Sequence, residues 1–417
     1  MVPSSSKISS PQTLPIGPDN STQWAGLAVE RTALQSLEQS LDTIAEHFAG
    51  MAGRLSAGPK ESRGYLCTDA GDITYAQNYL TQEGRLGELL TIKSLWALLD
   101  CRLSQVSPAD NASTVVKQKL AEFIKQAPFV EYCAGNYGRP GSPEVIDMFT
   151  NGKIPDQIRG LYTNQESPSV TPLGALLHYM HIHTPAADAH RLRLNMFRAY
   201  LKDRCNEGGH LNYLSFGTGN GFEFVRLKRG GELFNSTTLV GTNLDSLQST
   251  SSALKQMGAS APKLIEIDAK QLLTTGPKLR GSLSTLVESQ DLISCLGAFD
   301  YIPKRGETES LVIDSIKAQL ECLKPGGIFV ASFIMNGNPH KAVLRDLLNW
   351  KLNHRTIEDL TSISDQLELK PFKVEADIAP GTPAGISSSI PKKLQSGEFA
   401  IVKIDPLGVN CFLVIKK

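Results

Sequence analysis

The sequence has no excess of either charge, because 42 Lys and Arg residues balance 42 Asp and Glu residues over 417 positions. A chain without a basic excess has no overall field to hold a nucleic-acid backbone, so a polynucleotide partner is not favoured. It also lacks any run of about 18 apolar residues, which excludes a membrane-spanning helix. The composition that remains, 41% apolar and 20% charged, is typical of a globular protein.

The sequence has few cysteines, and their spacing suggests no disulfide or metal site. The seven cysteines are scattered, odd in number and never spaced as Cys-x-x-Cys, which suits a reducing compartment and argues against a structural zinc site. The first 23 residues are rich in Ser, Pro and Thr and lack the basic start and apolar core of a secretory signal. We therefore expect a disordered leader over residues 1–23 and a cytoplasmic location.

Two different sequence patterns follow the leader, first a helical one and then an alternation of strands and helices. Apolar residues recur at three- and four-residue steps in the stretches Leu34–Phe48, Leu86–Leu103 and Val115–Ile124, which predicts amphipathic helices. Residues 136–172 are rich in Gly, Pro and Asn and indicate an irregular connector. Helical patterns return at Leu173–His181 and Ala186–Cys205. We expect a helical N-terminal or lid domain over residues 24–170 and a second domain over residues 171–417.

After His210, short apolar runs alternate with helical stretches, which predicts a mostly parallel sheet covered by helices on both faces. Seven such apolar runs are predicted to be strands. They are Leu211–Phe216, Thr238–Leu244, Lys263–Ile267, Asp291–Leu296, Gly327–Phe333, Phe372–Ile378 and Cys411–Ile415. The last two have no helix between them and predict a terminal antiparallel pair.

The first predicted strand runs into a glycine turn. Gly217, Gly219 and Gly221 allow a tight turn and let a ligand approach the main chain, although many such turns have no ligand. A dinucleotide fingerprint would place its third glycine at position 222, which is Phe222. The short spacing therefore favours a ligand without a pyrophosphate.

Polar side chains follow the next two strands. Asn243 and Asp245 come after the second, where a ribose would bind in an open α/β sheet, and either could hold its hydroxyls. Asp245 could instead cap a helix, although its charge makes it the stronger ribose candidate. Asp268 and Ala269 end the third strand, where an acid and a small residue could hold an adenine, or again cap a helix.

The fourth strand ends at Leu296 and Gly297, and the chain then places Phe299, Asp300 and Tyr301 over the site. A helix over Ser310–Cys322 leads to Leu-Lys-Pro-Gly-Gly at 323–327 before the next strand. With the glycine turn, this order resembles class I S-adenosylmethionine-dependent methyltransferases over about residues 187–417. Residues 291–301, 349–356 and 408–416 more narrowly resemble a bacterial group related to extracellular-factor (3-hydroxy fatty acid methyl ester) synthases.

The resemblance implies a Rossmann-like α/β fold with a seven-stranded, mostly parallel sheet whose last strand is antiparallel. It also implies S-adenosylmethionine as cofactor and a set of cofactor-binding positions. These are Ser215, Gly217, Gly219 and Gly221 at the methionine part, Asn243 or Asp245 at the ribose, Asp268 and Ala269 at the adenine, and Leu296 and Gly297 beside them. The chain departs from the family at two places, because Ser215 replaces the acid two residues before the first glycine and Asn243 replaces the ribose acid.

Methyl transfer from a sulfonium needs alignment more than acid–base help, since a general base is required only when the acceptor must lose a proton. The catalytic candidates are Tyr301, Asp300, His354 and Arg355. Arg355 could clamp a carboxylate, or could form a surface ion pair with Glu358 or Asp359.

Two other side-chain groups have simpler explanations. His178, His181 and His183 are spaced so that only the first two share a helical face, which favours a lid or core helix over a metal site. We therefore predict no metal. Cys295 lies in a predicted strand and is expected to pack there.

The leading hypothesis is a methyltransferase of a small molecule or acyl acid, acting on oxygen or nitrogen. The N-terminal helices would shape the acceptor pocket, and the apolar stretch Leu86–Leu103 could instead form a homodimer interface. A non-catalytic binding or scaffold protein is the alternative that Ser215 and Asn243 favour. A nicotinamide-dependent oxidoreductase is disfavoured by Phe222 and by Leu-Lys-Pro-Gly-Gly.

Overall fold

The computed structural model describes most of the chain from residue 111 onward. The described ranges are 111–127, 129–130, 140–151, 172–182, 184–206, 210–224, 233–267, 276–303, 307–369, 372–376, 400–405 and 408–417, with isolated residues between 39 and 133. The predicted leader and most of the stretches 34–48 and 86–103 lie outside these residues. None of the helices described is long and apolar enough to cross a membrane.

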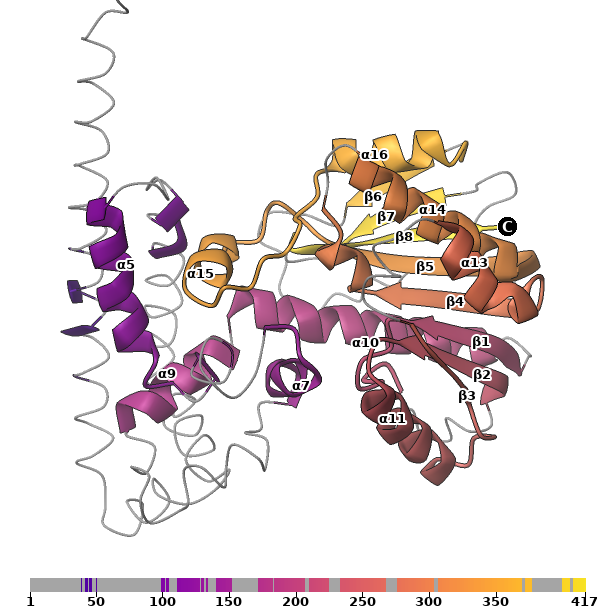
Figure 1. Ribbon diagram of the computed structural model, residues 1–417, viewed down its shortest axis with the longest axis horizontal. Coiled ribbons are helices and arrows are strands. Elements are labelled where there is room, and N and C mark those ends of the chain that lie inside the picture. Colours follow the sequence, from indigo (N-terminus) through magenta and orange to yellow (C-terminus); the bar gives the residue numbers. More distant parts are fainter. Residues whose placement is uncertain are drawn as a thin grey trace, which may run out of the picture.

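One sheet organises the described part of the chain (Figure 1). It has eight strands in the order β3-β2-β1-β4-β5-β8-β7-β6, and β8 is antiparallel to both of its neighbours. The strands are β1 (Leu211–Phe216), β2 (Phe234–Gly241), β3 (Lys263–Glu266), β4 (Gln290–Leu296), β5 (Leu323–Ile334), β6 (Phe372–Ala376), β7 (Ala400–Ile404) and β8 (Asn410–Lys416). The predicted α/β fold with an antiparallel last strand is confirmed.

The sequence prediction was wrong about the strand count and about the partner of β6. The structure adds β7, which lies in the stretch that the sequence indicated as a long loop. It places β7 between β6 and β8, so β6 pairs in parallel with β7 and the expected antiparallel pair of β6 and β8 does not form. β8 lies between β5 and β7 and is antiparallel to both, so β5 and β7 run in the same direction.

Helices cover both faces of the sheet because its central strands are apolar on both sides. Along β8, Cys411, Leu413 and Ile415 join one buried cluster with α13 (Gly276–Leu283), α14 (Glu307–Cys322) and α16 (Ile357–Gln366). The alternate residues Phe412 and Val414 join the cluster formed by α10 (Pro185–Asn206) and α11 (Leu244–Gln256) on the other face. The two-residue period of a strand thus builds both layers of the core.

Helices that precede the sheet lie beyond the carboxyl ends of its parallel strands (Figure 1). They are α5 (Asn111–Ile124), α7 (Pro143–Asn151) and α9 (Pro172–Ile182), and α7 packs against both α9 and α10. The sequence indicated an irregular connector over 136–172, so α7 corrects that prediction for residues 143–151. Its start fits the general preference for proline in the first turn, because Pro143 lacks an N–H that this turn would leave unbonded.

The N-terminal part of the chain also contacts the C-terminal part through Asp100. Its carboxylate accepts a hydrogen bond of 2.8 Å from the backbone N–H of Val343 in α15 (Lys341–Asp346). Burial raises the pKa of Asp100 to about 6. A segment that precedes the sheet is therefore bonded to the helix that follows β5.

Candidate functional site

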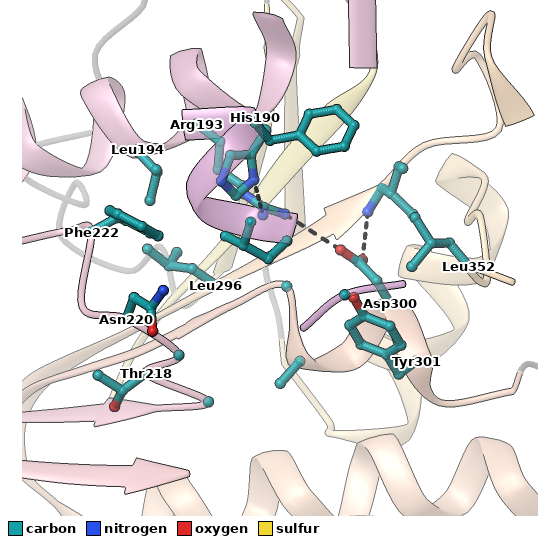
Figure 2. A pocket seen from close by; sticks show the side chains of 18 of the residues that line it. His190, Arg193, Leu194, Thr218, Asn220, Phe222, Leu296, Asp300, Tyr301 and Leu352 are labelled. Carbon is teal, nitrogen blue, oxygen red and sulfur yellow. Dashed lines mark hydrogen bonds and ion pairs between the residues drawn. The ribbon is translucent and has the colours of Figure 1, made fainter. Parts of the chain in front are cut away.

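A cavity of about 430 Å³ lies at the carboxyl ends of β1, β2 and β4. Its walls come from the turn after β1, from α10 and α7, from the short helix η4 (Ala298–Tyr301), and from residues 350 and 352 (Figure 2). Ligands in open α/β sheets bind outside the carboxyl ends of the strands, near the point where the strand order reverses. Here that point lies between β1 and β4, so the cavity is where the topology places a ligand site.

The glycine turn forms one wall of this cavity. Gly217, Gly219 and Gly221 all adopt positive φ, at 72°, 54° and 61°. Glycine adopts this conformation without the steric cost that other residues have, which explains why glycine stands at these positions. The backbone N–H groups of Gly217 and Thr218 donate to the carbonyl oxygen of Val240 and tie the turn to β2.

The three glycines differ in what surrounds them. A Cβ at Gly217 would lie 2.8 Å from the Cβ of Ala298, and a Cβ at Gly221 would overlap the side chain of Thr250. A Cβ at Gly219 would meet nothing within 4 Å. Gly217 and Gly221 are therefore needed for packing, whereas the backbone at Gly219 faces the open cavity that a ligand could enter.

Ser215, which replaces the expected acid before the glycines, is bonded to an acid from elsewhere in the chain. Its hydroxyl donates a hydrogen bond of 2.6 Å to Oε1 of Glu223, and both residues line the cavity. Glu223 is only 5% exposed, and burial raises the pKa of its carboxyl to about 7. Residues 222–224, directly after the last glycine, form a turn.

The structure separates the two ribose candidates. Asn243 lines the cavity and caps α11, accepting a hydrogen bond of 2.9 Å from the backbone N–H of Ser246. Asp245 lies in the first turn of α11, exposed and outside the cavity lining. The preference for Asp245 as ribose ligand is therefore not supported, and neither is its alternative as the cap. β2 ends at Gly241, three residues before the predicted end, so residue 243 takes the cap position.

Asp300 sits at the centre of a buried polar network (Figure 2). Its carboxylate accepts from the backbone N–H of Ile334 at 2.8 Å and from Nη1 of Arg193 at 3.4 Å. Nη2 of Arg193 lies 2.8 Å from Nδ1 of His190. Since a guanidinium only donates, Nδ1 accepts, and the ring proton is left on Nε2, 3.1 Å from the hydroxyl of Thr150.

The charges of this network are set by burial. Burial raises the pKa of Asp300 to about 6, although Arg193 acts in the opposite direction. Desolvation and the adjacent guanidinium of Arg193 hold the pKa of His190 well below its usual value, so the ring is neutral. Gly297, whose φ is 96°, leaves room for this arrangement, since a Cβ there would lie 3.1 Å from Nη2 of Arg193.

Tyr301 also lines the cavity, as the sequence predicted for its position. It is 44% exposed because it faces this space, yet the walls remove enough bulk water to raise the pKa of its hydroxyl to about 12. The hydroxyl accepts a hydrogen bond of 3.3 Å from Nε1 of Trp350. The hydroxyl of Tyr301 therefore stays protonated at neutral pH and does not act as a base.

His354 and Arg355 do not line the cavity, which argues against their predicted catalytic roles. Nε2 of His354 lies 3.2 Å from the side-chain amide of Asn338. Arg355 is fully buried, donates to the carbonyl oxygen of Ile302 at 3.3 Å and lies over the ring of Phe333. Because Arg355 is buried, the alternative of an ion pair at the surface is not supported either. Asp359, one of its suggested partners, forms a capping box with Thr356 at the start of α16.

Two predictions of core packing are confirmed. His178 and His181 are buried in α9, where Nδ1 of His178 accepts from the backbone N–H of Phe129 and the ring of His181 stacks on that of Phe129. Cys295 is fully buried in β4. Asp268, Ala269 and His183 lie outside the described residues.

The comparisons with known proteins give likeness of fold only. No protein-family model matches the sequence, and no curated protein matches it. Among solved structures, a possible exported protein from Bordetella parapertussis is 15% identical, with a TM-score of 0.42 over 74% of this chain and 99% of that one. Magnesium protoporphyrin IX methyltransferase from Synechocystis, solved with bound S-adenosylhomocysteine, is 12% identical over 66% and 98%, with a TM-score of 0.35.

An S-adenosylmethionine-dependent methyltransferase from Clostridium acetobutylicum is 20% identical over 34% of this chain and 51% of that one, with a TM-score of 0.25. Several of the similar structures are thus methyltransferases. At these identities the function has to be derived from the chain's own residues.

Sequence reasoning missed several residues that line the cavity, among them Glu223, Arg193, Ile146 and Phe149. Glu223 lies two positions after the last glycine. Arg193 lies in α10, which the sequence predicted as a helix without assigning any of its residues to the site. Ile146 and Phe149 come from α7. The sequence did contain a signal for Glu223. The resemblance places an acid at position 215, where this chain has Ser215, and Glu223 is a carboxylate close to the same glycine turn.

Proposed function

We propose that the chain is an S-adenosylmethionine-dependent methyltransferase of a small molecule or acyl acid. The observation that carries the proposal is the glycine turn after β1, where the one glycine with open space, Gly219, faces a cavity at the reversal point of the sheet. The antiparallel β8 beside β5 is the arrangement that the sequence resemblance implies. The two lines of support are independent, because one is local geometry and the other is topology.

The residues present fit such a cofactor. Gly219 leaves its backbone accessible, Asn243 offers an amide at the second strand, and Leu296 and Gly297 complete the lining at the fourth. When bound, S-adenosylmethionine supplies a methyl group on a positively charged sulfur. The contribution of the protein is then to align the acceptor with it, which can lower the barrier by about 7–11 kcal/mol.

The acceptor side of the cavity is apolar with one charged network. Phe149 of α7, Leu344 of α15 and Trp350 provide the apolar wall, and Arg193 provides a guanidinium. A guanidinium can bind a carboxylate with two hydrogen bonds. In this structure both Nη atoms of Arg193 are already bonded, to Asp300 and to His190, so Arg193 orders the polar side of the pocket, and the apolar wall supports a largely apolar acceptor.

A non-catalytic binding protein is the second candidate. It is favoured by Asn243, whose amide stands in the place of the ribose acid and already serves as a helix cap. Incubation with methyl-labelled S-adenosylmethionine and a panel of small carboxylic acids separates the two. A labelled ester or other labelled product supports the enzyme, and cofactor binding without transfer to any acceptor supports the alternative.

We expect S-adenosylhomocysteine to raise the melting temperature of the protein. Ligand that binds only the folded state at a hundred times its dissociation constant stabilises it by about 2.7 kcal/mol. Differential scanning fluorimetry with S-adenosylhomocysteine, and with NAD as the control, measures this shift. The absence of any shift at millimolar S-adenosylhomocysteine, or an equal shift with NAD, contradicts the proposed cofactor.

We expect Asn243→Asp to tighten S-adenosylhomocysteine binding by about tenfold. An aspartate keeps the cap of α11 and adds a charged acceptor for the ribose hydroxyls, and charge-assisted hydrogen bonds contribute about 1.5–3 kcal/mol against about 1 for neutral ones. A tenfold change needs only about 1.4 kcal/mol. Isothermal titration calorimetry measures the affinity.

Asp245→Ala is the matched control, since this exposed acid lies two residues away and outside the cavity. It should leave the affinity unchanged. A tenfold loss in Asp245→Ala, with no gain in Asn243→Asp, would return the ribose role to Asp245.

A further inference from the structure

The carboxylate of Glu223 is placed as a binding group rather than as part of the core. It lines the cavity at the glycine turn, and its side chain has little access to solvent. The hydroxyl of Ser215 donates to Oε1 at 2.6 Å, so this oxygen is fixed in position. A carboxylate has about four acceptor sites over its two oxygens, which leaves further capacity for a ligand donor.

This carboxylate has no counter-charge among the described residues, where no Lys, Arg or His nitrogen forms an ion pair with it. Of the described residues, the cation that acts on this carboxyl is Arg198 of α10, and its guanidinium donates to the carbonyl oxygen of Phe222 and to Oδ1 of Asn195. A buried carboxylate without a paired cation costs free energy in the empty protein. Such a group at a cavity wall is suited to bind a ligand that brings the missing positive charge.

We propose that Glu223, held by Ser215, binds the ammonium group of the methionine part of S-adenosylmethionine. Together the two residues supply from position 223 the negative charge that position 215 lacks. This inference rests on the proposed function, because it assigns one contact of the proposed cofactor. It also explains why Ser215 does not make the site degenerate.

Binding is then linked to a proton. Burial raises the pKa of Glu223 to about 7 in the free protein, so near pH 6 the carboxyl is mostly protonated. An arriving ammonium favours the ionised form, and the proton leaves to the solvent. Among the described residues, two other ionisable groups act on this carboxyl. Neither changes charge in this range, because Arg198 stays cationic and burial raises the pKa of Tyr213 well above its usual value.

The decisive experiment is calorimetry with two ligands on the full chain. S-adenosylhomocysteine carries the ammonium and no sulfonium, whereas 5′-methylthioadenosine has the same nucleoside and sulfur but no amino acid part. We expect Glu223→Gln to weaken S-adenosylhomocysteine at least tenfold at pH 7.5 and to leave 5′-methylthioadenosine unchanged. For the wild type, the dissociation constant of S-adenosylhomocysteine should rise up to about tenfold per pH unit below pH 7.

Repeating the titration near pH 6 in buffers of different ionisation enthalpy measures the protons released. The wild type should release close to one proton per S-adenosylhomocysteine, and Glu223→Gln should release almost none. Asp100→Asn is the matched control, because Asp100 is also a buried acid with a pKa raised to about 6 but lies outside the cavity lining. It should keep both the affinity and the proton release of the wild type.

The variant also has an expected effect without ligand. The pKa of Glu223 is raised on folding, so its ionisation is unfavourable in the folded state and the cost is fully present only above about pH 7. Glu223→Gln should therefore melt at a higher temperature than the wild type at pH 8 and show a smaller difference at pH 5. This readout shows that the variant is folded when its affinity is compared.

The outcomes separate this inference from the proposed function. If the wild type binds neither ligand, the proposed function fails. If the wild type binds S-adenosylhomocysteine and folded Glu223→Gln binds it equally well, or loses both ligands to the same extent, only the ammonium contact is refuted.

Discussion

Gly219→Val is expected to abolish S-adenosylhomocysteine binding in a protein that remains folded. Gly219 lines the cavity and is the one glycine of the turn whose Cβ position meets no protein atom within 4 Å, so a valine side chain there would fill space that a ligand could use. A β-branched residue at a φ of 54° also costs about 1–3 kcal/mol of stability. Calorimetry gives the affinity, and thermal melting shows that the variant is folded.

Gly258→Val provides the matched control. Gly258 follows α11 and has a φ of 85°, and a Cβ at this position would also meet nothing within 4 Å, but Gly258 does not line the cavity. The variant should lose a comparable amount of stability and keep its affinity. Unchanged affinity in folded Gly219→Val would show that the turn has no ligand-binding role.

Arg193→Met is expected to destabilise the protein by about 3–5 kcal/mol at pH 7.5. Methionine keeps much of the apolar stem but removes the cation from a pair in which both side chains are largely buried, and an unpaired buried charge costs about this much. Urea denaturation measures the loss. At pH 5 the loss should be smaller, because Asp300, with a pKa raised to about 6, takes up a proton and needs no cation.

The double variant Arg193→Met with Asp300→Asn is the control for this prediction. The amide oxygen can still accept from the backbone N–H of Ile334, so removing both charges should recover much of the stability. If the single variant is as stable as the wild type, or if its loss does not depend on pH, the pair does not contribute as described.

The sheet could be predicted well where strands are apolar on both faces. The bounds of β1 agree with those expected from the sequence, and those of β4 differ by one residue at its start. The two strands nearest the β6 edge were not predictable in the same way, since β7, the neighbour of the edge strand β6, reads Ala-Ile-Val-Lys-Ile in a stretch with few other apolar residues. An edge strand depends on its neighbour more than on its own pattern, which is why the pairing of β6 was also wrong.

The site could be predicted where local backbone chemistry decides it. Three glycines with positive φ and the position of Tyr301 follow from the residues between strands and helices. Roles that depend on long-range contacts did not follow. Arg355 and Arg193 are both arginines in stretches that mix apolar and polar residues. Only the tertiary structure shows that Arg355 is buried in the core and that Arg193 lines the cavity.

The position of α7 has a consequence for how the chain divides into parts. A fragment cut at residue 171, where the sequence suggests a boundary, would keep the whole sheet and the glycine turn but lose Ile146 and Phe149 from the cavity wall. It would also lose Gly141, which packs against the hydroxyl of Tyr301, and Thr150, which faces the ring of His190. The cavity is thus assembled from both sides of that boundary, so exchange of the sheet-forming segment between related chains would have to carry residues 140–151 with it.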